Sequence, residues 1–460
     1  MTAAAPDLAD VQGLVTYGYR DLGLARLVLL RAGDAGQFRA WLGALAGQVA
    51  TATANPTFTA VNVALTPSGL RRLGLPDDVL AMFSDEFLSG MTTEHRRLIL
   101  GDVDESAPER WAWGGPGDPA PDALLMLYAL DRAGRIALVE AQSAAYRAHG
   151  LEEVWAMDSV DLGRREHFGF RDGISQPAIE AVQRSARPDD VVKAGEFLLG
   201  YVNEYGQVTD RPLVPQAGDP AGVLPQDLGS GLRDLGHNGT YLVLRQLAQD
   251  VPGFWRFAER ATAGPGGAAD EAARDRLAAK MVGRWPSGAP LALAPEADDP
   301  AHADANDFRY AAADAAGMRC PIGSHVRRAN PRDSLDPRPG SDASVAVGKR
   351  HRLMRRGRPY GAPNGSEERG LLFMCVCANI ARQFEFIQHT WVNNPKFDGL
   401  YDDGDPLLAG HQPHGGTFTV QADPIRRRYV GLPRFVTVRG GAYLFLPGVR
   451  ALRYLAGLGT

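Results

Sequence analysis

The sequence is poor in cysteine, and this limits the covalent chemistry it can use. It has 3 Cys among 460 residues, and two of them, Cys375 and Cys377, stand in one apolar run. Neighbours along a single strand rarely form a disulfide, so we expect reduced, buried thiols in a reducing compartment. A Cys-x-Cys metal site is the alternative, although no second pair of soft ligands accompanies it.

Long apolar runs and long basic runs are also missing. The first residues lack the basic and apolar regions of a signal peptide, and no apolar run reaches the length that spans a bilayer. We therefore expect a cytoplasmic protein without a membrane partner. Lys and Arg number 49 against 54 Asp and Glu, and the net charge of −5 argues against nucleic acid as a partner.

The apolar pattern of the first half predicts a ferredoxin-like unit. Hydrophobic residues make up 45% and charged residues 22% of the chain, as is usual for a globular protein. Apolar periodicity predicts the order β-α-β, loop, β-α-β, which is the split βαβ pattern. The predicted strands cover 23–32, 58–65, 124–130 and 151–162, and the predicted helices cover 35–52, a short stretch after Thr66, and 132–148.

The second half repeats this pattern with longer insertions, so we predict an α+β protein of two ferredoxin-like halves, 1–165 and 166–460. The apolar stretch 196–201 is expected to lie in the sheet. Further strands are predicted at 241–245, 351–355, 371–378, 435–438 and 442–446, and helices at 247–262, 271–283 and 379–393.

One carboxylate stands between two glycines in Gly169-Phe170-Arg171-Asp172-Gly173. Glycine lets the backbone turn sharply and lie flat against a planar ligand, which would hold Asp172 at the face of that ligand. A desolvated carboxylate in that position can accept and return a proton. Taken alone, the motif fits an ordinary Asp-Gly turn better.

Two later residues favour the chemical interpretation. His325 follows a constrained Cys-Pro-Ile-Gly-Ser loop and precedes several arginines, and a neutral imidazole is a good axial ligand for iron. Alternation along the next strand turns Arg355 inward with Leu353 and turns Arg356 outward. An inward arginine needs a carboxylate such as Asp172 or a bound anion as its partner. The alternatives are a basic surface turn around His325 and a salt bridge of Arg355 that serves only the fold.

Together these motifs resemble the dye-decolourising (DyP-type) haem peroxidases, and the length resembles their larger bacterial subgroups. The resemblance runs nearly from end to end of the chain. It is carried by Gly169-Phe170-Arg171-Asp172-Gly173, Gly323-Ser324-His325-Val326-Arg327-Arg328, Asn330-Pro331-Arg332, His351-Arg352-Leu353-Met354-Arg355-Arg356-Gly357, Asp10-Val11-Gln12-Gly13-Leu14, Gln383-Phe384-Glu385-Phe386-Ile387-Gln388 and Arg439-Gly440-Gly441-Ala442-Tyr443.

The resemblance implies a dimeric α+β barrel arrangement of the two halves, with haem b (iron protoporphyrin IX) in the second. His325 would be the proximal iron ligand, and Asp172 and Arg355 would be catalytic on the distal side. Arg332 and Arg327 would meet the haem propionates. The residues implied to bind haem are Gly173, Ile174, Ser175, His325, Arg327, Asn330, Pro331, Arg332 and Arg355.

The implied activity is reduction of H2O2 to water while phenolic or dye-type donors are oxidised in one-electron steps. An aspartate as proton acceptor predicts activity that favours acidic pH. The alternative is a haem-binding or haem-handling protein with little turnover. The oligomeric state stays open.

Two features depart from patterns found in some subgroups of the family, and one of them is Gly357, which stands where an Arg-x-Asn pattern on the distal strand would have Asn. Some subgroups place an aspartate before the long helix, where it bonds the proximal imidazole, but this chain has Asn379 there. Glu385, further along the predicted helix, is the other candidate for that role. An anionic partner would make the histidine a stronger donor to iron.

Overall fold

The computed structural model describes residues 5–183, 185, 187–268, 270–364, 367–409 and 415–459. Within these ranges the main sheet has nine strands in the order β10-β12-β9-β15-β2-β3-β1-β4, with β11 beside β12. All its strand pairs are antiparallel. The order contains the same four-strand arrangement twice, once in each half of the chain.

The first unit confirms the predicted split βαβ pattern. Asp34 and Asp131 cap its two long helices by accepting hydrogen bonds from backbone N–H groups of the first turn. Its strand order, β2-β3-β1-β4, is that of a ferredoxin-like unit. The unit comprises β1 (Leu24–Ala32), α1 (Ala35–Ala46), β2 (Thr59–Leu65), β3 (Ala123–Ala129), α6 (Arg132–Ala148) and β4 (Leu151–Asp158).

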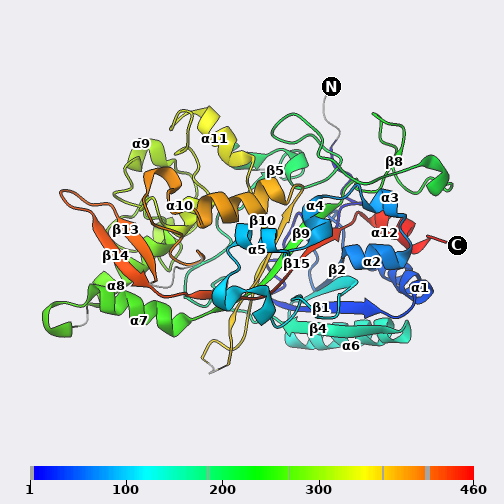
Figure 1. Ribbon diagram of the computed structural model, residues 1–460, viewed down its shortest axis with the longest axis horizontal. Coiled ribbons are helices and arrows are strands. Elements are labelled where there is room, and N and C mark those ends of the chain that lie inside the picture. Colours follow the sequence, from blue (N-terminus) through cyan, green and yellow to red (C-terminus); the bar gives the residue numbers. More distant parts are fainter. Residues whose placement is uncertain are drawn as a thin grey trace.

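The second unit has the matching order β10-β12-β9-β15. Long insertions separate its elements, and these insertions carry most of the extra helices at one end of the molecule (Figure 1). The unit comprises β9 (Thr240–Gln249), α7 (Val251–Thr262), β10 (Met354–Arg355), β11 (Arg358–Tyr360), β12 (Gly370–Cys377), the π-helical segments η8 (Ala381–Glu385) and η9 (Ile387–Val392), and β15 (Val436–Leu446).

The two units meet at both edges of their sheets. Phe445 of β15 pairs with Leu65 of β2, and at the other edge Ser159 forms a β-bridge with Tyr360. One hydrophobic cluster joins the facing surfaces of the two units, including Leu29 and Met126 from the first and Met374 from the second. The two ferredoxin-like halves are thus observed, whereas the full barrel arrangement and the boundary at 165/166 stay predictions.

The other elements are short and mostly belong to insertions. Figure 1 shows α7 to α11 with β13 and β14 at one end, and α1 and α6 at the other. They are α2 (Pro67–Leu73), α3 (Asp77–Leu80), α4 (Asp85–Ser89), α5 (Glu94–Leu100), β5 (Ala178–Ile179), β6 (Val191–Val192), β7 (Leu213–Val214), β8 (Arg233–Asp234), α8 (Glu271–Val282), α9 (Tyr310–Asp314), α10 (His325–Ala329), α11 (Asp342–Lys349), β13 (Gly416–Val420), β14 (Arg427–Leu432) and α12 (Val449–Ala456).

Several predicted elements differ from the structure, and the strand predicted at 351–355 is limited to Met354–Arg355. The stretch 196–201 is buried but turns instead of joining the sheet, because a short apolar run does not distinguish a strand from a buried loop. The helix predicted at 35–52 ends at Ala46, and Gly47 follows as its cap. The two closing strands are one strand, β15, whose register shifts between Val438 and Gly440.

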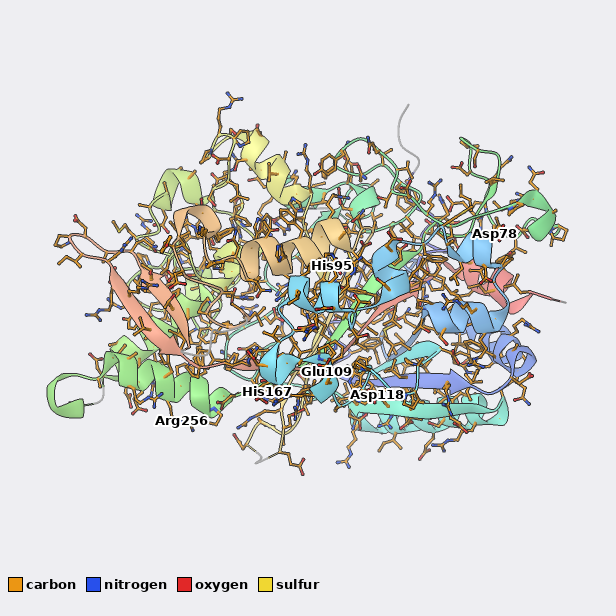
Figure 2. The ribbon with its side chains drawn as sticks, in the orientation of Figure 1. Asp78, His95, Glu109, Asp118, His167 and Arg256 are labelled. Carbon is orange, nitrogen blue, oxygen red and sulfur yellow. The ribbon has the colours of Figure 1, made fainter. Side chains whose placement is uncertain are left out.

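Charged side chains are spread over the surface of many elements. Asp78, Glu109, Asp118 and Arg256 are all exposed; Asp78 and Arg256 lie toward opposite ends of the molecule in Figure 2, and Glu109 and Asp118 lie between them. None of the helices in the described ranges combines the length and the apolar character needed to cross a bilayer.

Candidate functional site

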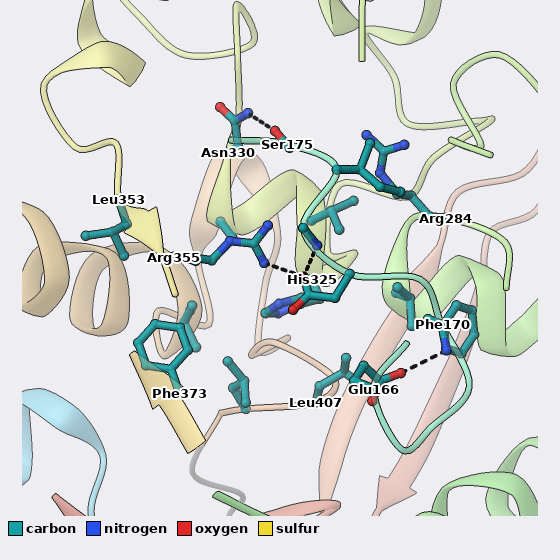
Figure 3. Close-up of a pocket in the computed structure, with 18 of the residues that line it drawn as sticks. Glu166, Phe170, Ser175, Arg284, His325, Asn330, Leu353, Arg355, Phe373 and Leu407 are labelled. Carbon is teal, nitrogen blue, oxygen red and sulfur yellow. Dashed lines mark hydrogen bonds and ion pairs between the residues drawn. The ribbon is translucent and has the colours of Figure 1, made fainter. Parts of the chain in front are cut away.

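A largely apolar cavity in the second half collects most of the predicted site residues (Figure 3). Its wall is built from the loop after β4, the start of α10, the strands β9, β10 and β12, and the π-helical segments. The predicted residues that line it are Asp172, Gly173, Ile174, Ser175, His325, Asn330, Arg332 and Arg355. Segments far apart in the sequence therefore converge on one site.

The loop that carries Asp172 is folded tightly on itself. Gly169 and Gly173 have φ values of +100° and +78°, which L side chains rarely adopt. Asp172 donates its backbone N–H to the carbonyl of Arg164 at 2.9 Å. Glu166 fastens the interior of the loop, because its carboxylate accepts the N–H groups of Phe168 and Phe170, each at 2.9 Å. Asp172 is therefore presented to the cavity by a rigid turn.

Arg355 lies beside Asp172 and donates from Nη1 to Oδ1 at 3.0 Å. Gln176 holds the backbone of Arg355, accepting its N–H at 3.1 Å and donating to its carbonyl at 3.3 Å. Leu353 lines the same cavity, as alternation predicted. The prediction that Arg356 points outward is wrong in one respect. Arg356 faces away from the cavity but is buried beneath the N-terminal segment, where it donates to the carbonyls of Leu14 and Val15.

His325 opens α10 and is held by a buried carboxylate, Asp405. The imidazole Nδ1 lies 2.9 Å from Oδ2 of Asp405, whose other oxygen accepts the N–H groups of Leu407 and Leu408 at 2.9 and 3.0 Å. Asp405 is completely buried, so its orientation is set by these contacts. Because Nδ1 is engaged, Nε2 is the ring nitrogen left to bind a ligand.

Asp405 replaces both predicted partners of the proximal histidine. The oxygen of Asn379 instead accepts the N–H of Arg382 at the start of the π-helical segments. The carboxylate of Glu385 is used by Tyr443 and Arg96 in a separate buried network. No sequence motif linked His325 to Asp405, because 80 positions separate them. The two side chains come together only in the folded protein.

The charges of the site oppose the effect of burial. Burial by itself would lower the pKa of His325, but the negative charge and hydrogen bond of Asp405 outweigh it and raise that pKa above its ordinary value. Burial by itself would raise the pKa of Asp172, but Arg355 and the Gly173 N–H outweigh it and hold that pKa below its ordinary value. Two polarised pairs, Asp405–His325 and Asp172–Arg355, therefore face one cavity.

Removing Asp405 is expected to destabilise the protein. In Asp405→Ala, the two backbone N–H groups and His325 lose their acceptor, so the free energy of unfolding should fall by at least about 2 kcal/mol. Asp405→Asn should lower the free energy of unfolding by less, because its amide oxygen can still accept hydrogen bonds from the two N–H groups. Urea unfolding would measure both, with Asp210→Ala at an exposed position as control. Equal stability of Asp405→Ala and Asp210→Ala would contradict this prediction.

The cavity also has a cationic wall that differs from the predicted one. Arg332 lines the cavity and stacks 3.8 Å from the ring centroid of Phe308, and Arg284 and Arg352 line it too. Arg327 lies outside the wall, where its guanidinium is used by the carboxylate of Asp314 and the carbonyl of Cys320. Pro331 does not line the cavity either.

Arg352 is a cationic wall residue with unused hydrogen-bonding capacity. It is buried, its Nη2 atom makes no hydrogen bond, and the carboxylate of Asp190 lies 3.9 Å away. A buried guanidinium without a full set of acceptors suits an anionic ligand group. β10 contains only Met354 and Arg355, so strand alternation does not extend to residue 352.

These observations fit a large planar cofactor that carries both a metal and anionic groups. In the described part of the chain, no three His, Cys, Asp or Glu side chains gather to hold a metal ion. A metal bound by His325 would therefore need further ligands from a cofactor. The apolar walls and the buried Arg352 fit the rest of such a group, as haem would require.

Comparisons with known proteins agree with this arrangement. The sequence profile described as "Dyp-type peroxidase, C-terminal" matches residues 312–418. Dye-decolorizing peroxidase msp1 of Mycetinis scorodonius is 30% identical, and the match covers 98% of this chain and 88% of that protein. Multifunctional dye peroxidase DyP2 of an Amycolatopsis species is 30% identical, with 93% and 92% covered.

Solved structures extend the likeness to the whole fold. A fungal DyP-type peroxidase from Auricularia auricula-judae has a TM-score of 0.80 at 26% identity, and the match covers 99% of this chain and 100% of that one. The predicted bacterial subgroup stays a prediction, since the relatives come from fungi as well as a bacterium. The end-to-end match with the msp1 peroxidase shows that the chain belongs to the dye-decolorizing peroxidase family and is an oxidoreductase of that type.

Proposed function

We propose that this protein uses haem b, held in the described cavity, to reduce H2O2 to water while it oxidises phenolic or dye-type donors in one-electron steps. The observation that carries the proposal is the facing of two pairs, Asp405–His325 and Asp172–Arg355, across one apolar cavity. Two solved relatives support it. One is a dye-decolorizing peroxidase with an engineered haem pocket, and the other is a dye-decolorizing peroxidase in complex with 2,6-dimethoxyphenol.

The chain's own residues suggest how haem would be held. His325 would bind the iron through Nε2, while Asp405 keeps Nδ1 engaged. Arg352 and Arg332 would meet the propionates, because a guanidinium matches a carboxylate. The bound haem would supply the redox chemistry that cleaves the peroxide O–O bond and draws single electrons from the donor.

Asp172 and Arg355 would handle protons and charge during peroxide cleavage. Asp172 would accept a proton from one oxygen of H2O2 and return it to the other, which leaves as water. Arg355, 3.0 Å from Asp172, would stabilise the negative charge that develops as the O–O bond breaks. The tight Gly169–Gly173 turn would keep the carboxylate in place between the two transfers.

A direct assay tests the proposal. The purified protein would be loaded with haem, its absorption spectrum recorded, and oxidation of 2,6-dimethoxyphenol by H2O2 followed over time. We expect a stable haem spectrum and many turnovers per protein molecule. A haem spectrum without turnover would favour the haem-handling alternative, and no haem spectrum would overturn both.

Activity is expected to persist into acidic solution. Asp172 must be ionised to accept a proton, and Arg355 helps to hold its pKa below the ordinary value of about 3.9. The kcat/KM for H2O2 should therefore stay level down to about pH 4 and fall only below it. In Arg355→Leu, burial acts without that opposing charge, so the fall should begin at a higher pH.

The measurement is kcat/KM against pH for both proteins, within the range where circular dichroism shows them folded. An acid limb at the same pH in the two proteins would contradict the coupling of Asp172 to Arg355.

A further inference from the structure

A second cavity of about 160 Å³ adjoins the first at the Asp172–Arg355 pair. Asp172, Gly173 and Arg355 belong to the walls of both cavities. The rest of its wall comes from segments 17–23, 160–166 and 356–359 together with Gln176 and Leu371. We call it the side chamber. A water molecule occupies about 30 Å³ in the liquid, so the side chamber accepts a ligand considerably larger than water.

The side chamber is lined by six arginines against three carboxylates, so positive charge is in excess there. Among the described residues, only Arg355 of these six has a carboxylate within 4 Å. Three carboxylates also line the chamber, and Asp172 among them is the one paired with Arg355. The six arginines are Arg20, Arg164, Arg165, Arg355, Arg356 and Arg358.

The inner arginines are held in place by backbone carbonyls, which leave their charge intact. Arg356 is buried and donates to Leu14 and Val15, and burial lowers its pKa to about 9. Arg358 donates to the carbonyls of Gly18 and Tyr19 at 2.8 and 2.9 Å. Its Nε is buried and has no hydrogen-bond partner.

The outer arginines are exposed, and their charges repel each other. Partial burial lowers the pKa of Arg20 and the positive charge of Arg164 lowers it further, while the negative charges of Asp21 and Asp304 oppose these effects. No hydrogen bond from the side chain of Arg20 or Arg164 to another described residue is present, so both guanidiniums are available to a ligand. Hydrogen peroxide is neutral and gains little from such a field, whereas an anion is drawn in and concentrated by it.

We propose that the side chamber admits small anionic peroxides, such as peroxymonosulfate, as oxidants alongside H2O2. This inference rests on the proposed function, because it adds an oxidant to the same reaction. The balanced step is HSO5⁻ + 2 AH → HSO4⁻ + H2O + 2 A•, where AH is a phenolic donor. The peroxide O–O bond breaks, sulfate leaves with one oxygen, and the other oxygen leaves as water with two electrons and two protons from the donors.

The test compares two oxidants in one holoenzyme. Second-order rate constants for peroxymonosulfate and H2O2 would be measured with 2,6-dimethoxyphenol as donor, after subtraction of the uncatalysed rate. They would be repeated at rising ionic strength and in the double variant Arg20→Gln/Arg164→Gln. The control, Arg147→Gln/Arg453→Gln, removes the same charge from exposed positions on α6 and α12.

We expect the ratio of the peroxymonosulfate constant to the H2O2 constant to fall about tenfold in the double variant and to stay level in the control. Salt should lower the ratio in the wild-type enzyme and much less in the double variant, because it screens the chamber charges. A ratio within twofold of wild type in both variants would overturn the side-chamber proposal alone. Failure of the wild-type holoenzyme to reduce either oxidant would overturn the proposed function and this inference together.

A structural measurement gives an independent readout. Crystals soaked in bromide without peroxide should show anomalous density beside Arg20 or Arg164 in the wild-type protein and none there in the double variant. Bromide absent from the wild-type chamber, or present equally in both proteins, would count against the proposal.

Discussion

Replacing His325 by alanine is expected to abolish peroxidase turnover, the largest effect of any single substitution considered. The structure leaves Nε2 of His325 free on the cavity side while Asp405 engages Nδ1. Mutating a residue that hydrogen-bonds to a metal ligand typically lowers metal affinity or activity 10–100-fold. Loss of the ligand itself should therefore lower them further. Haem titration by absorbance and the 2,6-dimethoxyphenol assay would measure affinity and turnover.

The matched control for this variant is His389→Ala, at an exposed position on η9. It should bind haem and turn over as the wild-type protein does. Imidazole added to His325→Ala should restore part of the haem spectrum, because the space left beside Asp405 can accept it. A His325→Ala protein with an unchanged haem spectrum and turnover would exclude His325 as the iron ligand.

Neutralising the Asp172–Arg355 pair is expected to produce the second-largest loss. Asp172→Asn removes the proton acceptor, and proton transfer by a positioned side chain typically raises the reaction rate 10²–10⁴-fold. Arg355→Leu removes a group that stabilises negative charge in the transition state, and loss of such a group typically lowers kcat about 10²–10³-fold. The double variant should lose less than the product of the two, because the side chains are joined by a 3.0 Å hydrogen bond and act as a unit.

The pair would be assayed by the rate of H2O2 consumption by the haem-loaded protein, which separates peroxide cleavage from donor oxidation. Asp78→Asn, at an exposed site on α3, removes one carboxylate elsewhere and should leave the rate unchanged. If the single variants consume H2O2 at the wild-type rate, another group handles the proton and the distal assignment is wrong.

Local pattern was enough to predict much of the fold. The helix predicted at 132–148 matches α6, because an N-cap aspartate and apolar periodicity are local signals. The strands of the first unit were predicted within a few residues for the same reason. The prediction was wrong at 196–201, where burial of Phe197 and Leu199 comes from tertiary packing around a turn and carries no periodic signal of its own.

The sequence by itself determined the Asp172 turn and the inward direction of Arg355, because each depends on residues within a few positions. Only the tertiary structure decided that Asp405 holds His325, that Arg352 lines the cavity while Arg327 does not, and that Arg356 supports a charged side chamber. These contacts join segments up to 342 positions apart. The energies of these contacts depend on how distant segments pack together in the folded protein, and local residue spacing does not specify that packing.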